Sequence, residues 1–399
     1  HLGPEGNVLG RFGPYFTDAH RTPWGDAVNV AEAASDGVRR YFIENAVGWI
    51  RDHHVDGLRL DAVHAIVDPT PIPFVQELTR AVHAAARHEQ RTALVTIESS
   101  ANDPRIVRPE GEHGWGCDAV WDDDVHHSLR VALTGERQRY YRAYAGTADL
   151  ATAWERRWVY RGQYSPSFDR RHGAPADTID HRHFIVFGTN HDHIGNTPAG
   201  RRLLADADPA DPRHRLGASA ILLSPFTPML FMGEEYGETA PFPYFVDHGD
   251  PDLVETVRQG RQREFADADW SGGVADPADP ATFESAVLDV TATEREPHRS
   301  RLAMYTELIR LRRELPILTD ADARQDVSVV DDAVLVVRSL PGVTASLVLN
   351  FSSVAFDHRA PDPAGDVVFD SNDERWGGPG WMADRVGPWS ARLCVASVP

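Results

Sequence analysis

Three acidic residues stand at the ends of three separate apolar runs of the chain. They are Asp61, which closes VDGLRLD (55–61), Glu98, which comes near the end of TALVTIES (92–99), and Asp192, which follows HFIVFGTN (183–190). Parallel α/β folds place their ligands at the carboxyl ends of the strands. We therefore expect these three carboxyl groups to lie at the ligand-binding edge of a sheet.

The first run brings two opposite charges to one side of a strand. Side chains alternate across a strand, so Gly57, Arg59 and Asp61 share one face. An arginine two residues away can keep a carboxylate ionised and oriented, as a carboxylate nucleophile requires. A purely structural ion pair is the alternative.

The second run presents Glu98 in the same way, on one face with Leu94 and Thr96. A carboxyl group at the end of a buried apolar strand is partly desolvated, which suits it to donate a proton near neutrality. A helix cap or a loop salt bridge is the alternative.

An Asp, a Glu and a second Asp suffice for a two-carboxylate glycosidase with a third acid assisting. In a retaining glycosidase the two main carboxyl groups are roughly 5 to 5.5 Å apart.

The third cluster also allows a metal site. His191 and His193 are two residues apart, as ligands on one strand could be, and Asp192 could join them. Three further histidines near Asp61 keep this alternative open: His53, His54 and His64.

The elements that must position these residues follow from the hydrophobic pattern. Short apolar runs alternate with helical periodicity, which predicts repeated β-α units over a parallel sheet. We predict strands in the runs 55–61, 92–99, 117–121, 183–190 and 227–232, and helices in 81–90 and 216–223. A closed barrel of this kind needs eight strands, so the missing three would have to precede His1.

The pattern changes after a predicted helix over 305–315. Alternating runs at 332–340 and 345–351 predict a small antiparallel, β-sandwich-like domain over 325–399, with the catalytic domain over 1–324. The segment 236–300 is rich in Pro, Gly and Asp, and we expect long surface loops there.

Composition narrows the possible partners. The 399 residues are 42% apolar, with 40 basic against 60 acidic side chains and a net charge of −20. This charge disfavours nucleic acid and anionic membrane surfaces. Only two cysteines occur, Cys117 and Cys394, so we expect no disulfide framework and a cytoplasmic location. The sequence contains no run of about 18 apolar residues, which is the length needed to span a bilayer.

At these acidic residues the sequence resembles the alpha-amylase family of glycoside hydrolases, and within it the maltooligosyltrehalose trehalohydrolases. DGLRLDAVH (56–64), IES (97–99) and NHD (190–192) are similar to the family's three catalytic segments, in the same order. Longer stretches carry the resemblance to the subfamily: 7–29, 122–136, 162–165, 228–242 and 251–265. The resemblance implies a (β/α)8 barrel that lacks its first strands in this chain.

The resemblance also implies roles for individual residues. Asp61 would be the nucleophile, Glu98 the proton donor, and Asp192 the group that holds the distorted sugar in the transition state. The implied substrate-binding residues are Arg59, which would also orient Asp61, together with His64, His191, Asn196, Asp123, Asp124, His126, His127 and His1. His193 departs from the subfamily, which usually has Gln at this position.

The implied reaction is hydrolysis of the α-1,4 bond next to the terminal trehalose of maltooligosyltrehalose, with release of trehalose. The implied partner is this α-glucan substrate, and neither a cofactor nor a metal is required. The alternatives are a branching or debranching relative, a metal-dependent hydrolase, and an inactive or glucan-binding fragment.

The metal alternative and the glycosidase make opposite predictions about chelators. A two-carboxylate glycosidase needs no metal, so we expect EDTA to leave glucan hydrolysis unchanged. Activity that EDTA abolishes and Zn²⁺ restores would instead favour the histidine site.

Overall fold

The computed structural model describes residues 8–22, 25–265, 273–357 and 365–397. The chain divides into two compact units. The first comprises His1–Asp123 and Tyr160–Ile185, and the second comprises Asp124–Val159 and Val186–Pro399. His1, expected to bind substrate, lies outside the described residues.

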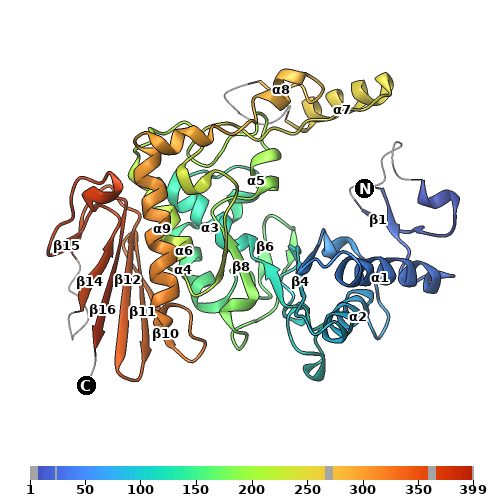
Figure 1. Ribbon diagram of the computed structural model, residues 1–399, viewed down its shortest axis with the longest axis horizontal. Coiled ribbons are helices and arrows are strands. Elements are labelled where there is room, and N and C mark those ends of the chain that lie inside the picture. The colour runs from blue at the N-terminus through green and yellow to red at the C-terminus, as the bar shows by residue number, and fades with distance from the viewer. Residues whose placement is uncertain (1–7, 23–24, 266–272, 358–364, 398–399) are drawn as a thin grey trace. The chain divides into compact units, whose positions relative to one another are not determined.

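A parallel sheet forms the centre of the first unit (Figure 1). Its strands, in spatial order, are β3 (Gly57–Leu60), β4 (Leu94–Ile97), β5 (Ala119–Trp121) and the start of β8 (Phe184–Phe187). Each strand lies inside a predicted apolar run, so the prediction of neighbouring parallel strands is confirmed. The chain passes along β8 into the second unit, where β9 (Thr227–Met229) is the next strand.

Two helices of the first unit lie side by side, α1 (Ser35–Arg51) and α2 (Phe74–His88) (Figure 1). The apolar side chains of α2 recur at helical spacing and are buried, as an amphipathic helix on a sheet requires. They are Val75, Leu78, Val82 and Ala86. The unit also contains two short antiparallel pairs, β1 (Phe16–Thr22) with β2 (Gly25–Val28) and β6 (Tyr164–Ser165) with β7 (Arg170–Arg171).

Four helices of the second unit contribute buried apolar residues. They are α3 (Asp123–Thr134, whose first residue belongs to the first unit), α4 (Thr147–Arg156), α6 (Pro212–Leu222) and α9 (His298–Glu314). Every residue of α6 from Arg215 to Leu222 is buried. Such a helix belongs to the interior of a domain.

The prediction of surface loops throughout 236–300 is wrong in part. The segment contains α7 (Pro251–Glu264), α8 (Pro280–Glu284) and the start of α9. Asp250 and Asp279 cap α7 and α8 by accepting backbone N–H groups, and each is followed by a proline at the first helical position. No residue of α7 is buried, so the hydrophobic periodicity that reveals other helices is missing.

An antiparallel sheet of five strands ends the chain (Figure 1). Its spatial order is β10 (Arg324–Val330), β11 (Ala333–Leu340), β12 (Val343–Asn350), β16 (Ser390–Ser397) and β14 (Asp366–Asp370). Two further short strands, β13 (Phe356–Asp357) and β15 (Arg385–Val386), pair with each other. The predicted antiparallel strands are confirmed, while the domain boundary at 324/325 stays a prediction.

Helices of the second unit pack against this sheet. The helix α4 contacts β10 and β11, and α6 contacts β12 and β16. Two side chains secure these contacts through backbone carbonyls: Gln325 Nε2 donates to Trp154 O at 2.8 Å, and Arg215 Nε donates to Ser371 O at 2.8 Å.

In the part of the chain that the structure describes, no helix is both long enough and apolar enough to cross a membrane.

One buried ion pair joins β14 to β16 and yields a stability prediction. Arg392 Nε lies 2.8 Å from Asp370 Oδ2, and the two side chains are only 3% and 2% exposed. Asp370→Ala would leave the Arg392 charge buried without its carboxylate, so we expect a loss of about 3 to 5 kcal/mol in the free energy of unfolding. Chemical denaturation measures this loss.

The exposed pair of Asp357 and Arg385 provides the matched control. Its side chains are 77% and 51% exposed, so Asp357→Ala should cost less than about 1 kcal/mol. Equal losses in the two variants would contradict the burial argument.

Candidate active site

The register of β3 and β4 brings Asp61 and Glu98 to adjacent strand ends. Leu60 and Ile97 are the last paired residues, so each acid follows its strand directly. Backbone hydrogen bonds continue past the strands, from Glu98 N to Leu60 O at 2.9 Å and from Val63 N to Glu98 O at 3.0 Å. The strands approach closely at their start, where a Cβ on Gly57 would lie 2.7 Å from the Leu94 carbonyl oxygen.

Arg59 contacts both acids. Its Nη1 lies 2.7 Å from Asp61 Oδ1, and its Nη2 lies 3.5 Å from Glu98 Oε2. The guanidinium carbon stands 4.1 Å from the centre of the Trp121 ring on β5, a cation–π contact that restricts its position. One arginine therefore lies within ion-pair distance of both carboxyl groups.

The turn after β3 adds a second contact to Glu98. The Ala62 backbone N–H donates a short hydrogen bond to Glu98 Oε2. Ala62 has φ 45° and ψ 43°, in the left-handed region where a residue with a Cβ is strained by about 1 kcal/mol or more. The turn thus holds an unfavourable backbone conformation at the residue that binds the Glu98 carboxylate.

The two acids differ in their access to solvent. The Asp61 side chain is 51% exposed and the Glu98 side chain 19%. An open carboxylate can approach an electrophilic carbon, whereas a more enclosed one can exchange a proton while shielded from bulk water. His64, in the turn that follows Asp61, is exposed.

The third acid lies in the second unit on α5 (His191–Gly195). Asn190 caps this single turn, because its Oδ1 accepts the His193 N–H at 2.9 Å. The His191 and Asp192 side chains are both 45% exposed, and Nε2 of the histidine lies 3.5 Å from Oδ2 of the aspartate. Asn196, the residue after the helix, is exposed as well.

Beneath α5 lies a cluster of aromatic and imidazole rings. His193 stacks on His126 of α3 with ring centroids 3.7 Å apart and an interplanar angle of 15°. His126 Nδ1 lies 2.7 Å from Gly188 O, and its Nε2 lies 3.3 Å from the Tyr141 hydroxyl. Burial lowers the pKa of both histidines well below the ordinary value. Burial also lowers the pKa of the neighbouring His127, to about 3.

Three of the residues expected to bind substrate are buried. Asp124, His126 and His127 are 4%, 0% and 8% exposed, while Asp123 is half-buried. Asp124 accepts hydrogen bonds from the Tyr144 hydroxyl at 2.5 Å and from Val159 N at 2.7 Å. Asp124 and His126 therefore support the residues around them and offer little surface to a sugar.

Sequence reasoning did not foresee two contributions to the site. One is Trp121, which is 8% exposed and packs under Arg59. The backbone of Ala62 was missed entirely, because a left-handed alanine leaves no mark in the sequence.

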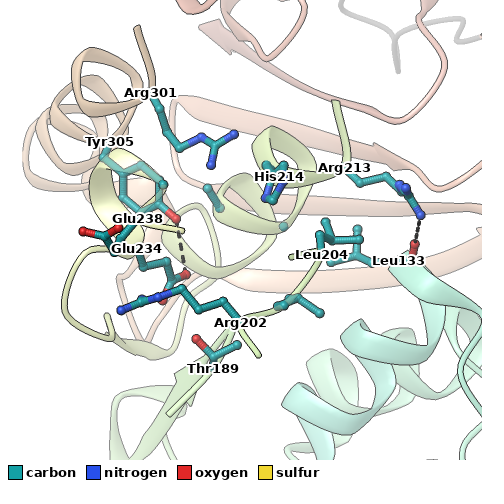
Figure 2. A pocket seen from close by; sticks show the side chains of 15 residues that line it. Leu133, Thr189, Arg202, Leu204, Arg213, His214, Glu234, Glu238, Arg301 and Tyr305 are labelled. Atoms are coloured by element: carbon teal, nitrogen blue, oxygen red, sulfur yellow. Dashed lines mark hydrogen bonds between the residues drawn. The ribbon is translucent and has the colours of Figure 1, made fainter. Parts of the chain in front are cut away.

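The second unit also contains a polar cavity of about 70 Å³ that sequence reasoning missed (Figure 2). The Tyr305 hydroxyl donates to Glu234 Oε1 at 3.2 Å, and Arg202 lies beside this carboxyl group. Gly188 allows the close approach, since a Cβ there would lie 2.9 Å from Glu234 Oε1. Burial raises the pKa of Glu234 to about 7 and lowers the pKa of His214, on the same wall, to about 3.

Among the residues described, no group of three or more His, Cys, Asp or Glu side chains is arranged to hold a metal ion.

Comparison with solved structures identifies the class of fold. A crystal structure from Salmonella typhimurium, provisionally described as an alpha amylase, is 33% identical and superposes with a TM-score of 0.86, covering 100% of this chain and 66% of that one. The alpha-amylase of H. orenii shares the fold at 16% identity, with a TM-score of 0.54 over 94% of this chain and 67% of that one. The fold is that of the alpha-amylase family of glycoside hydrolases.

Sequence comparison narrows the assignment. No family model matches the chain. The malto-oligosyltrehalose trehalohydrolase of Arthrobacter ramosus is 45% identical over 327 residues, 82% of this chain and 56% of that protein. The protein of the same name from Brevibacterium helvolum is 34% identical over 398 residues, 98% of this chain and 66% of that protein. The chain belongs to the malto-oligosyltrehalose trehalohydrolase family, and it spans about 56% to 66% of the length of these relatives.

The cavity around Glu234 yields a pH prediction. The pKa of this carboxyl group rises from 4.5 to about 7 on folding, so between these values the folded state binds more protons than the unfolded state. Glu234 therefore contributes a loss of stability as pH rises through this window, of up to about 3 kcal/mol. Glu234→Gln should remove this contribution. The thermal midpoint of the variant minus that of wild type should therefore increase between pH 4.5 and pH 7.

The exposed Glu284 supplies the control. Glu284→Gln makes the same chemical change at the surface, and the difference from wild type should depend more strongly on pH for Glu234→Gln than for this control. If the thermal midpoint of Glu234→Gln followed the same pH dependence as that of wild type, the raised pKa of Glu234 would be refuted.

Proposed function

We propose that the chain hydrolyses the α-1,4-glucosidic bond next to the terminal trehalose of maltooligosyltrehalose and releases trehalose with retention of configuration. The observation that carries the proposal is the pair of carboxyl groups, Asp61 and Glu98, that contact one arginine at adjacent strand ends. The names of the relatives supply the substrate class.

In the proposed mechanism Asp61 attacks the anomeric carbon and forms a covalent glycosyl intermediate. Glu98 protonates the leaving glycosidic oxygen and then removes a proton from the water that hydrolyses the intermediate. Arg59 orients Asp61, which its 2.7 Å contact supports. Asp192 holds the sugar hydroxyls as the ring flattens in the transition state.

The remaining substrate contacts form part of the same proposal. The exposed or half-buried candidates are those that can touch a sugar directly: Arg59, His64, Asp123, His191 and Asn196. The buried Asp124, His126 and His127 would act by supporting their neighbours. Neither a cofactor nor a metal enters the mechanism, and water is the second reactant.

We extend the proposal to the architecture. The parallel strands would belong to a (β/α)8 barrel, the arrangement that places catalytic residues at strand ends, and residues 325–399 would form a separate β domain. The expectations that barrel strands precede His1 and that the protein is cytoplasmic stay predictions.

Trehalose release from maltotriosyltrehalose, compared with hydrolysis of maltopentaose, tests the function. We expect trehalose from the first substrate and much slower cleavage of the second, because the linkage next to trehalose distinguishes them. Asp61→Ala should lower kcat on the order of 10,000-fold, and Glu98→Gln about 100- to 10,000-fold.

Asp56→Ala is the matched control, because the Asp56 side chain is 93% exposed just before the same strand. It should retain wild-type kcat. Equal cleavage of both substrates would refute specificity for trehalose, and full activity in Asp61→Ala would refute the mechanism.

A further inference from the structure

The proposed mechanism uses Asp192 but leaves unexplained what fixes its orientation. The helix α5 that carries it has five residues. A single turn is not stable through its own hydrogen bonds, since helix formation becomes favourable only over longer segments. The direction of Asp192 therefore depends on how neighbouring side chains anchor α5.

Besides the Asn190 cap and the hydrogen bond from Arg261 Nη2 to Gly195 O at 3.0 Å, two residues of α5 contribute to this anchor. Ile194 is fully buried, and the His193 ring stacks on His126. His126 is itself fixed on three sides, by Gly188 O, by the Tyr141 hydroxyl and by the Phe187 ring, whose centroid is 5.8 Å away. The stack thus holds the α5 turn against His126 of α3.

We propose that His193 is a positioning residue, which through its stack on His126 sets the direction of Asp192 for the reaction, and that the stack requires both imidazoles to be neutral. This inference rests on the proposed function. It gives a role to residue 193, a position at which the subfamily that this sequence resembles usually has Gln.

The charges around the stack explain why neutrality matters. The titratable and charged groups that face the two rings are His127, Arg130, His191 and Tyr141. Arg130 pairs with Glu136 at 2.8 Å, yet its charge and the neighbouring histidines still disfavour another proton. Two imidazolium rings 3.7 Å apart in this buried setting would repel each other.

The sign of the pH effect follows from these depressed pKa values. The unfolded chain takes up protons below about pH 6.5, where both folded histidines stay neutral. The contribution of the two histidines to the stability of the folded state is therefore fully present above pH 6.5. It is lost progressively as the pH falls below that value.

The experiment compares His193→Ala, which removes the ring, with His193→Phe, which keeps a stacking ring that cannot titrate. Steady-state trehalose release from maltotriosyltrehalose gives kcat and KM. Hydrogen–deuterium exchange of peptides over 188–197 reports the order of the α5 turn independently of activity. His88→Ala, at an exposed position near the end of α2, is the control.

We expect His193→Ala to lower kcat about 100-fold with little change in KM, because Asp192 acts in the transition state and a small displacement suffices. Exchange over 188–197 should rise. His193→Phe should keep kcat within about threefold, with wild-type exchange and a smaller fall of the thermal midpoint between pH 7.5 and pH 5. If the alanine variant does not fold, His193→Leu, which also lacks an aromatic ring, takes its place with the same expectations.

Unchanged exchange and unchanged kcat in the ring-less variant would overturn the positioning role. A fall of kcat in His193→Phe equal to that in His193→Ala would also overturn the positioning role, since stacking would then not be the cause. Wild-type protein that releases no trehalose would refute the proposed function, whereas the exchange and pH measurements would still decide the role of His193.

Discussion

The candidate site depends first on the parallel register of β3 and β4. Because Leu60 pairs with Ile97, the next residue of each strand is a carboxylic acid at the same edge of the sheet. Two like charges so placed would repel, and Arg59 contacts both. Its own position is restricted by the Trp121 ring on the third strand. A slip of one residue in β3 would send Arg59 and Asp61 together to the face opposite Glu98, so that one arginine could no longer contact both acids.

Much of this arrangement could be predicted from short patterns. Alternation within VDGLRLD places Arg59 and Asp61 on one face, and the apolar runs mark strands because buried parallel strands need continuous apolar sequence. The structure confirms the strands and the contact between arginine and aspartate. The left-handed backbone at Ala62 was beyond prediction, since its cause is the tertiary fit of the turn to Glu98.

Polar residues misled the sequence reasoning in both directions. The charged segment before α9 contains two capped helices, because an Asp-Pro start stabilises even a helix such as α7 that buries no residue. Conversely, Asp124 and His126 lie in the interior, each with hydrogen-bond partners that lie far away in the sequence. A polar residue near a catalytic motif is as consistent with support as with substrate contact, and only burial distinguishes the two roles.

The two parts of the proposed machinery are held by different physical means. Asp61 and Glu98 follow strands whose backbone hydrogen bonds continue into the turn, so their positions depend on the sheet itself. Asp192 stands on one helical turn that the Asn190 cap and buried side chains must hold in place. Substitutions remote from the chemistry should therefore affect Asp192 more readily than the paired acids. The His126–His193 stack is where such sensitivity is concentrated, because it joins the short turn to the fully buried face of α3.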